Sequence, residues 1–476
     1  MVDRLARSVL LPGFAGTTAP DWLLREVADG LGGVVLFGRN VTDDEQVAAL
    51  TARLRGERDG VVVGIDEEGG DVTRLDAATG SRVPGPLALG AVGDPALTRR
   101  VAGQLAARLA ACGVTVNLAP SADLTLHADD PIIGVRSFGS DPRAVAGQVA
   151  AFVRGTQGEG VAACAKHFPG HGASTTDSHF ALPALPREDA ELRAAELVPF
   201  AAAVEAGVRA VMPGHLVVPS WGELPATLNP RAITGVLRGE LGFTGTVITD
   251  ALEMAAVAGS LGDVDGLAQA AVAALVAGAD ALCVGGETAD AAVVARLVDA
   301  IGEAVKAGTL PEERLAEASA RVAALGAAPA PVSEVDPALG LAAARRAVRV
   351  RGEARLAAAP VVVDVEVPPT MAAGPVPWGL GSHLAELVPG TAVVRVAGGD
   401  EPAVEPGRQV VLVTRDAHRH ADVAALVTRL AADREVVHVE TGVPGPELGA
   451  VATIDTHGGS YVSLRAAAEL LAASAD

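Results

Sequence analysis

Short apolar runs recur along the first 325 residues, and most precede a stretch with helical periodicity. Apolar runs without polar alternation are typical of parallel strands buried on both faces. The runs occupy residues 8–14, 32–38, 60–66, 113–120, 161–170, 209–217, 245–254 and 279–286. Asp often precedes the helical stretches and Gly often ends them, as helix caps do. Eight strand–helix units predict an α/β fold of the (β/α)8 TIM-barrel type, with an open doubly wound sheet as the alternative.

The pattern changes near residue 326. Residues 324–336 (ALGAAPAPVSEVD) lack periodicity and are rich in Ala and Pro, which is typical of a linker. New apolar runs follow at 360–367, 391–398, 409–416, 435–442 and 450–456. We therefore expect a barrel domain over residues 1–325, a linker over 326–340 and a smaller α/β sandwich domain over 341–476.

Charge and apolar content exclude several classes of protein. The chain has 37 Lys and Arg against 58 Asp and Glu, a formal net charge of −21, whereas a nucleic-acid partner needs a basic surface. No uninterrupted apolar stretch is long enough to span a membrane, and no secretory signal opens the chain. We expect a cytoplasmic protein without nucleic-acid or membrane partners, and the pattern indicates no oligomeric state. Cys112, Cys164 and Cys283 lie in apolar runs and are expected to be buried, reduced thiols.

Polar residues gather where the predicted barrel strands end. Catalytic groups of such barrels lie at the carboxyl ends of the strands. Five strands are followed by such residues: Asp66, Glu67, Glu68 and Arg74; Asp123, Asp129, Asp130 and Arg136; Lys166 and His167; His215; and Asp250. This convergence favours an enzyme over a structural barrel.

Asp250 is a lone carboxylate at the end of the apolar strand TVITD. One interpretation is an N-cap for the segment that follows, ALEMAAVAG. The other is a nucleophile, because a carboxylate at a barrel mouth can attack an anomeric carbon and form a glycosyl ester. Nearby cations would keep it ionised, and Arg74, Arg136 and Lys166 are candidates, or they bind sugar hydroxyls instead.

Asp177 and His179 lie two residues apart in the loop KHFPGHGASTTDSHFALP (166–183). In an extended chain such residues project to one side. A carboxylate beside an imidazole fixes its tautomer and raises its basicity, so the pair can act as a general acid and base. The alternative is a turn with a surface histidine.

A metal site is the competing chemistry for this loop. His167, His171, Asp177 and His179 are possible ligands. However, Pro169 and Gly170 interrupt any helical ligand spacing, so we expect neither a metal nor another cofactor. A serine nucleophile is not indicated, because no GxSxG motif follows a strand.

Together these residues give the chain a resemblance to the β-N-acetylhexosaminidases of glycoside hydrolase family 3. The matching segments are GIDEEGGDVTRL (64–75), VRSFGSDP (135–142), KHFPGHG…DSH (166–179) and VITDALEM (247–254). They occur in the family's order and span the predicted barrel. The loop with the His–Asp pair is specific to this branch of the family.

The resemblance implies a retaining β-N-acetylglucosaminidase that removes terminal β-linked N-acetylglucosamine from small carbohydrates, such as cell-wall recycling fragments or chitooligosaccharides. It implies Asp250 as nucleophile and His179, partnered by Asp177, as acid/base. It also implies sugar-binding roles for Asp66, Arg74, Arg136, Lys166 and His167. Ala173 departs from the family, which usually has Asp directly after GHG.

Two alternatives remain at this point. A histidine acid/base is neutral when deprotonated and does not repel phosphate as a carboxylate would, so the site could work as a β-N-acetylglucosaminide phosphorylase. The chain could also be a non-catalytic sugar-binding barrel, although the intact set of Asp177, His179 and Asp250 argues against this.

Overall fold

The structure is a computed structural model that describes residues 1–127, 130, 132–172, 182–254, 264–285, 289–329, 333–370, 372–374 and 377–475. Its backbone contacts divide the chain into two compact units. The first unit comprises residues 1–67, 98–133 and 140–335, and the second comprises 68–97, 134–139 and 336–476. Two segments that lie early in the sequence therefore belong to the same unit as the C-terminal residues.

Each apolar run of the first 325 residues contains one strand, as predicted. The strands are β1 (Leu10–Pro12), β2 (Gly33–Leu36), β3 (Val62–Ile65), β4 (Val116–Asn117), β5 (Ala162–Phe168), β6 (Ala210–Pro213), β7 (Thr246–Val247) and β8 (Leu282–Val284). Strands β2 to β7 form a parallel sheet in sequence order, and β1 pairs in parallel with β8. A parallel bridge between Ile248 and Ala281 connects the residues beside β7 and β8. The α/β class with a parallel sheet is thus confirmed.

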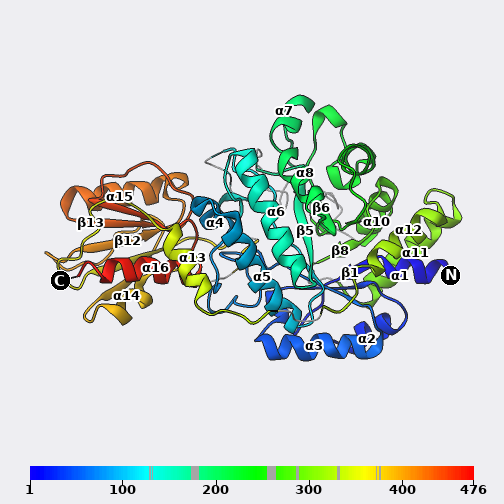
Figure 1. Ribbon diagram of the computed structural model, residues 1–476, viewed down its shortest axis with the longest axis horizontal. Helices are drawn as coiled ribbons and strands as arrows, with labels where there is room; N and C mark the ends of the chain where they lie inside the picture. Colours follow the sequence, from blue (N-terminus) through cyan, green and yellow to red (C-terminus); the bar gives the residue numbers. More distant parts are fainter. Residues whose placement is uncertain are drawn as a thin grey trace. The chain divides into compact units, whose positions relative to one another are not determined.

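Helices alternate with these strands (Figure 1). They are α1 (Val2–Ser8), α2 (Asp21–Ala28), α3 (Asp44–Glu57), α5 (Pro95–Ala111), α6 (Pro142–Gly158), α7 (Asp189–Ala194), α8 (Leu197–Glu205), α10 (Val264–Ala277), α11 (Ala291–Lys306) and α12 (Glu312–Ala323), with a π-helix over Arg231–Glu240. The expected aspartate caps are present: the side chains of Asp43, Asp141 and Asp290 accept backbone N–H groups at the starts of α3, α6 and α11.

The interior between the strands of the first unit is filled by apolar side chains. Every strand except β7 contributes to this cluster, and Ile248 joins it from the position directly after β7; the cluster includes Leu11, Val35, Val62, Val116, Ala162, Cys164, Ala210, Met212, Ile248 and Cys283. A core packed in this way has no room for a ligand. Polar chemistry in this unit is therefore expected at the strand ends.

The second unit contains a six-stranded sheet. Its strands are β9 (Arg349–Gly352), β10 (Val361–Glu366), β11 (Ala392–Ala397), β12 (Val410–Thr414), β13 (Val436–Glu440) and β14 (Ala452–Asp455), in the order β11-β10-β12-β13-β14-β9. All pairings are parallel except that of β9 with β14. The helices are α4 (Pro86–Val92), α13 (Leu339–Ala347), α14 (Gly381–Leu387), α15 (Ala421–Asp433) and α16 (Tyr461–Ala472).

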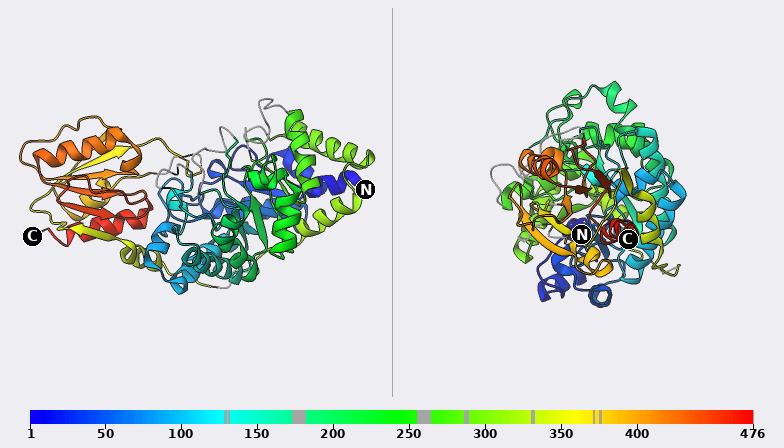
Figure 2. Two further views of the ribbon diagram at one scale, coloured as in Figure 1. Left: turned by 90° about the horizontal axis from the view of Figure 1, so that it is seen from above. Right: turned by 90° about the vertical axis from the view of Figure 1, so that its left-hand side faces the viewer.

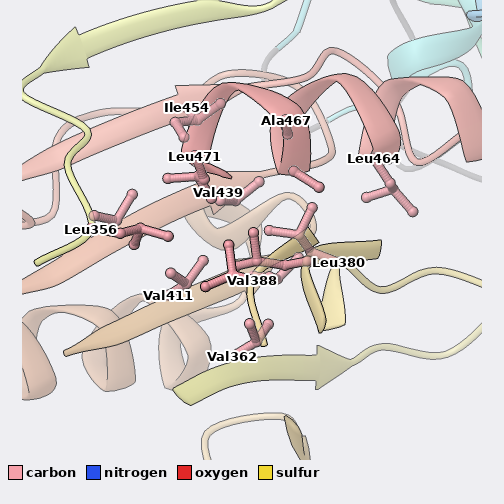
Figure 3. Close-up of a cluster of buried hydrophobic side chains, with 14 of the residues drawn as sticks. Leu356, Val362, Leu380, Val388, Val411, Val439, Ile454, Leu464, Ala467 and Leu471 are labelled. Carbon is pink, nitrogen blue, oxygen red and sulfur yellow. The ribbon is translucent and has the colours of Figure 1, made fainter. Parts of the chain in front are cut away.

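Helices cover both faces of this sheet (Figure 2). Leu426 and Leu430 of α15 pack on one face, against Val363 and Leu412. On the other face, residues of α14 and α16 meet the sheet, and Figure 3 shows Leu471 of α16 next to Val439 of β13. Strands β10, β12, β13 and β14 are therefore buried on both sides, which explains their apolar sequence.

Two further expectations can be compared with the structure. Cys112, Cys164 and Cys283 are buried and form no disulfide, as expected. Within the described part of the chain, no helix is long and apolar enough to cross a membrane.

Candidate active site

Lys166 and Asp66 form a partly buried ion pair at the carboxyl ends of two strands of the first unit. Asp66 follows β3 directly, and Lys166 lies near the end of β5. The Lys166 Nζ lies 2.6 Å from Asp66 Oδ1, and the lysine side chain is only 3% exposed. Burying either charge alone would be costly, and each compensates the other. The pair brings a carboxylate and an ammonium together, which are groups that accept from and donate to sugar hydroxyls.

The chain beyond Asp66 is held by the neighbouring strand. Asn117, the last residue of β4, accepts the Glu67 backbone N–H at 3.1 Å and donates to the Glu67 carbonyl at 2.8 Å. Asn117 is fully buried. This two-way amide contact fixes the backbone at the residue after Asp66, and it thereby limits how far the Asp66 carboxylate can move.

Asp123 forms a second buried carboxylate site, with His167 of β5. The His167 Nδ1–H donates to Asp123 Oδ2 at 2.7 Å, and the backbone N–H groups of His167 and His171 donate to the same carboxylate. Burial raises the pKa of Asp123, but His167, His171 and their hydrogen bonds outweigh it and lower that pKa to about 2. Asp123 is thus an ionised acceptor that sets the orientation of the His167 ring.

The sequence drew attention to Asp123 only as one of several acidic residues after a strand. The contact that gives it a role joins residues 44 positions apart. The spacing of neighbouring residues in the sequence cannot predict such a contact. By contrast, Asp66, Lys166 and His167 were predicted site residues, and each lies at the carboxyl end of its strand.

Asp250 lies after β7 and is half-buried. Its Oδ1 accepts the Ala251 backbone N–H at 2.8 Å. Residues 251–254 form a turn rather than the first turn of a helix. An N-cap instead binds the N–H two or three residues on. Most of the segment that Asp250 would cap, ALEMAAVAG, lies outside the described residues, so the cap and the nucleophile both stay predictions.

Arg136 and Arg74, predicted to bind sugar, belong to the second unit. Arg136 forms a two-pronged contact with Glu68: Nη2 lies 2.7 Å from Oε1 and Nε lies 3.0 Å from Oε2. Both side chains are almost fully buried. This geometry locks both planar groups. Arg74 is half-buried.

The predicted acid/base pair, Asp177 and His179, lies outside the described residues, as does Ala173. The chain leading to them is described up to Gly172. A side chain at position 172 would collide with the Leu124 carbonyl, since a Cβ there would lie 1.6 Å from that oxygen. Together with the His171 N–H bound to Asp123, this close approach fixes where the loop begins.

The competing metal hypothesis gains no support from the described residues. Among them, no group of three or more His, Cys, Asp or Glu side chains is arranged to hold a metal ion. His167 and His171 lie with their ring centroids 6.3 Å apart, edge to face. Of the four residues considered as ligands, Asp177 and His179 lie outside the described part.

Comparison with known families identifies the class of this protein. A sequence model described as the glycosyl hydrolase family 3 N terminal domain matches residues 20–325, more than half of the chain. The protein is therefore a glycoside hydrolase. It belongs to family 3 of these enzymes, as the resemblance noted in its sequence implied.

Individual relatives agree with this assignment. The chain is 37% identical over 354 residues to a β-hexosaminidase of Thiobacillus denitrificans, covering 69% of this chain and 97% of that protein. It is 39% identical over 275 residues to a β-hexosaminidase of Chromobacterium violaceum, covering 56% and 75%. Among solved structures, a family 3 β-N-acetylglucosaminidase from a Paenibacillus species superimposes with a TM-score of 0.89 at 32% identity, over 100% of this chain and 97% of that one.

Proposed function

We propose that this protein is a retaining β-N-acetylglucosaminidase that removes terminal, non-reducing β-linked N-acetylglucosamine. The observation that carries the proposal is the likeness to the Paenibacillus β-N-acetylglucosaminidase along the whole of both chains. The substrates that fit are small carbohydrates, namely muropeptide fragments of the cell wall or chitooligosaccharides.

The proposed mechanism has two steps. In the first, a carboxylate oxygen of Asp250 attacks the anomeric carbon while His179 donates a proton to the leaving glycosidic oxygen. The bond to the aglycone breaks and a covalent glycosyl–Asp250 ester forms. In the second step, neutral His179 takes a proton from water as that water attacks the anomeric carbon; the bond from this carbon to the Asp250 oxygen breaks, and the sugar is released with its configuration retained. Asp177 orients the His179 ring and stabilises its charged form.

The remaining predicted site residues bind the sugar in this proposal. Asp66 and Lys166 already form an ion pair, and their side chains are 17% and 3% exposed. They are suited to hold hydroxyls at a fixed distance from the anomeric carbon. The His167 ring is oriented by the contact of its Nδ1 with Asp123, and we assign its Nε2 to a sugar hydroxyl. The family resemblance assigns a sugar-binding role to Arg74 and Arg136 as well. Preorganised polar groups of this kind spare the transition state the cost of rearranging water.

We further propose that residues 1–325 form a closed (β/α)8 barrel that carries the chemistry. A linker over 326–340 joins it to an α/β sandwich domain over 341–476. The strand order β2 to β7 and the parallel pairing of β1 with β8 support the barrel.

The function is tested by hydrolysis of p-nitrophenyl β-N-acetylglucosaminide beside the matching β-glucoside, with and without phosphate. We expect turnover of the first substrate only, free N-acetylglucosamine as product, and no dependence on phosphate. Phosphate-dependent release of the sugar 1-phosphate would identify a phosphorylase instead. Sugar binding without turnover of either substrate by the folded protein would identify a binding protein.

His179→Ala should slow substrates unequally. For a sugar leaving group, as in chitobiose, we expect kcat/KM to fall about 10²-fold, because that oxygen needs a proton as it departs. For the dinitrophenyl glycoside, whose leaving group is stable as an anion, kcat/KM should fall only a few-fold. Steady-state assays of both substrates provide the measurement, and an equal loss on both would rule His179 out as the general acid.

A further inference from the structure

His215 is a fully buried polar residue for which the mechanism so far has no use. It follows β6 by two residues and is 0% exposed. Its Nε2 lies 2.9 Å from the Ala251 carbonyl oxygen, and its Nδ1 lies 2.8 Å from the Thr227 hydroxyl. Because a carbonyl oxygen only accepts, Nε2 carries the proton and donates it. The ring is therefore held at both nitrogens and has one orientation.

The residue that His215 binds is the immediate neighbour of the proposed nucleophile. Ala251 is held at both of its backbone polar groups: its N–H donates to Asp250 Oδ1 at 2.8 Å, and its carbonyl accepts from His215. The next residue, Leu252, donates its N–H to the carbonyl of Cys283 in β8. The turn after β7 is thus attached to the ends of both adjacent strands, and the attachment to β6 runs through His215.

Hydrogen-bond satisfaction alone does not require this histidine. The Ala251 carbonyl already accepts the Met254 N–H at 3.2 Å. Placing an imidazole in a fully buried position costs free energy that an apolar side chain of similar size would not. The second bond adds direction, because two donors fix the peptide group that joins Ala251 to Leu252. The Ala251 N–H belongs to the preceding peptide group, across the Ala251 Cα, and donates to Asp250 Oδ1.

We propose that His215 is a positioning residue that sets the direction of the Asp250 carboxylate through Ala251. The inference rests on the proposed role of Asp250 as nucleophile. Attack on an anomeric carbon needs the reacting oxygen in a narrow range of positions, and a displacement of about 1 Å can cost about 10²-fold in rate. Thr227 contributes indirectly, because its hydroxyl is hydrogen-bonded to His215 Nδ1 and so fixes the orientation of the ring.

Three variants separate positioning from packing. His215→Leu removes the donor to Ala251 and should lower kcat about 10- to 100-fold with little change in KM, because the sugar-binding groups are untouched. His215→Gln keeps an N–H donor on a chain of similar reach and should recover much of that loss. Thr227→Val keeps the shape but removes the anchor of the ring, and should show a smaller fall, again in kcat.

Asn229→Ala provides the matched control. Asn229 is buried in the same loop as Thr227 and holds the carbonyl of Trp221. Its loss should lower the melting temperature while kcat per folded molecule stays near the wild-type value. A fall in kcat equal to that of His215→Leu would mean that any loosening of this loop harms activity, and the positioning role would be overturned.

The direct measurement is the rate at which a slow 5-fluoro glycosyl fluoride forms the covalent adduct, followed by intact-protein mass spectrometry and normalised to folded protein. Slower adduct formation in His215→Leu, with rescue in His215→Gln, is the expected result. If the wild-type protein forms its adduct on Asp250 and His215→Leu forms it equally fast, the inference about His215 fails alone. If the wild-type protein forms no adduct on Asp250, the proposed function fails first. Should His215→Leu not fold, Thr227→Val and His215→Gln give the same readout.

Discussion

Asp250→Asn should lower kcat/KM for p-nitrophenyl β-N-acetylglucosaminide by about 10⁴-fold or more. The amide nearly matches the carboxylate in size and can still accept the Ala251 N–H through its oxygen. The amide lacks the anionic oxygen that attacks the anomeric carbon to form the ester, and it lacks the negative charge that stabilises the oxocarbenium-like transition state. Removing a covalent nucleophile abolishes almost all of the chemical contribution to rate.

A rescue experiment makes this result specific to the nucleophile. In Asp250→Gly, added azide should occupy the vacated space, attack the anomeric carbon of the β-glycoside and yield the α-glycosyl azide with restored turnover. Asp265→Asn is a suitable control, because Asp265 is an exposed acid in the first turn of α10 that pairs with Arg296. It should leave kcat/KM unchanged. An Asp250→Asn variant with near wild-type activity would remove Asp250 from the mechanism.

The strands of this protein were readable from the sequence because most are buried on both faces. Each predicted apolar run contains one strand, in both units. One strand, β9 (Arg349–Gly352), lies outside the predicted runs. Its residues are mostly exposed and include two arginines, so it carries no apolar run. It exists because it pairs antiparallel with β14 at the edge of the sheet, and that partner lies about a hundred residues further along the chain.

The candidate site was readable only in part, for a related reason. Asp66, Lys166, His167 and Asp250 were predicted as site residues because each stands at the end of an apolar run, where a polar residue is conspicuous. Asp123 and His215 also stand beside such runs, but their roles depend on contacts with His167 and Ala251, 44 and 36 residues away. In the structure, residues 68–97 and 134–139, with Arg74 and Arg136, group with the C-terminal residues by backbone contacts, and no local pattern in the sequence indicates this grouping.

Asp123→Asn should lower kcat/KM about 10³-fold, although Asp123 touches the sugar in no step of the proposed mechanism. The carboxylate accepts the Nδ1–H of His167, so it favours the tautomer that carries its proton on Nδ1 and, in the proposed mechanism, accepts from a sugar hydroxyl at Nε2. The amide of asparagine can instead donate to Nδ1, which moves the ring proton to Nε2. His167 would then donate where the sugar hydroxyl expects an acceptor, and comparable tautomer errors at catalytic histidines cost about 10⁴-fold.

The same substitution should change how stability depends on pH. The pKa of Asp123 is lowered to about 2 in the folded protein, below the ordinary value of about 4 for an aspartate. A lowered folded-state pKa stabilises the fold above the ordinary value, and this contribution is lost as the pH falls from about 4 towards 2. Denaturant unfolding between pH 6 and pH 2 should therefore show a steeper loss of stability below pH 4 in the wild type than in Asp123→Asn.

Activity measurements on single and double variants decide whether Asp123 acts through His167. Asp123 stays ionised throughout the range above pH 4, so it cannot produce an acid limb of the kcat/KM profile there, and the wild-type profile should owe that limb to other groups. His167→Ala supplies the comparison. If Asp123 works through the ring, adding Asp123→Asn to His167→Ala should cost much less activity than Asp123→Asn costs alone, because the tautomer no longer matters. A full additional 10³-fold loss in the double variant would show that Asp123 works instead through the loop that begins at His171.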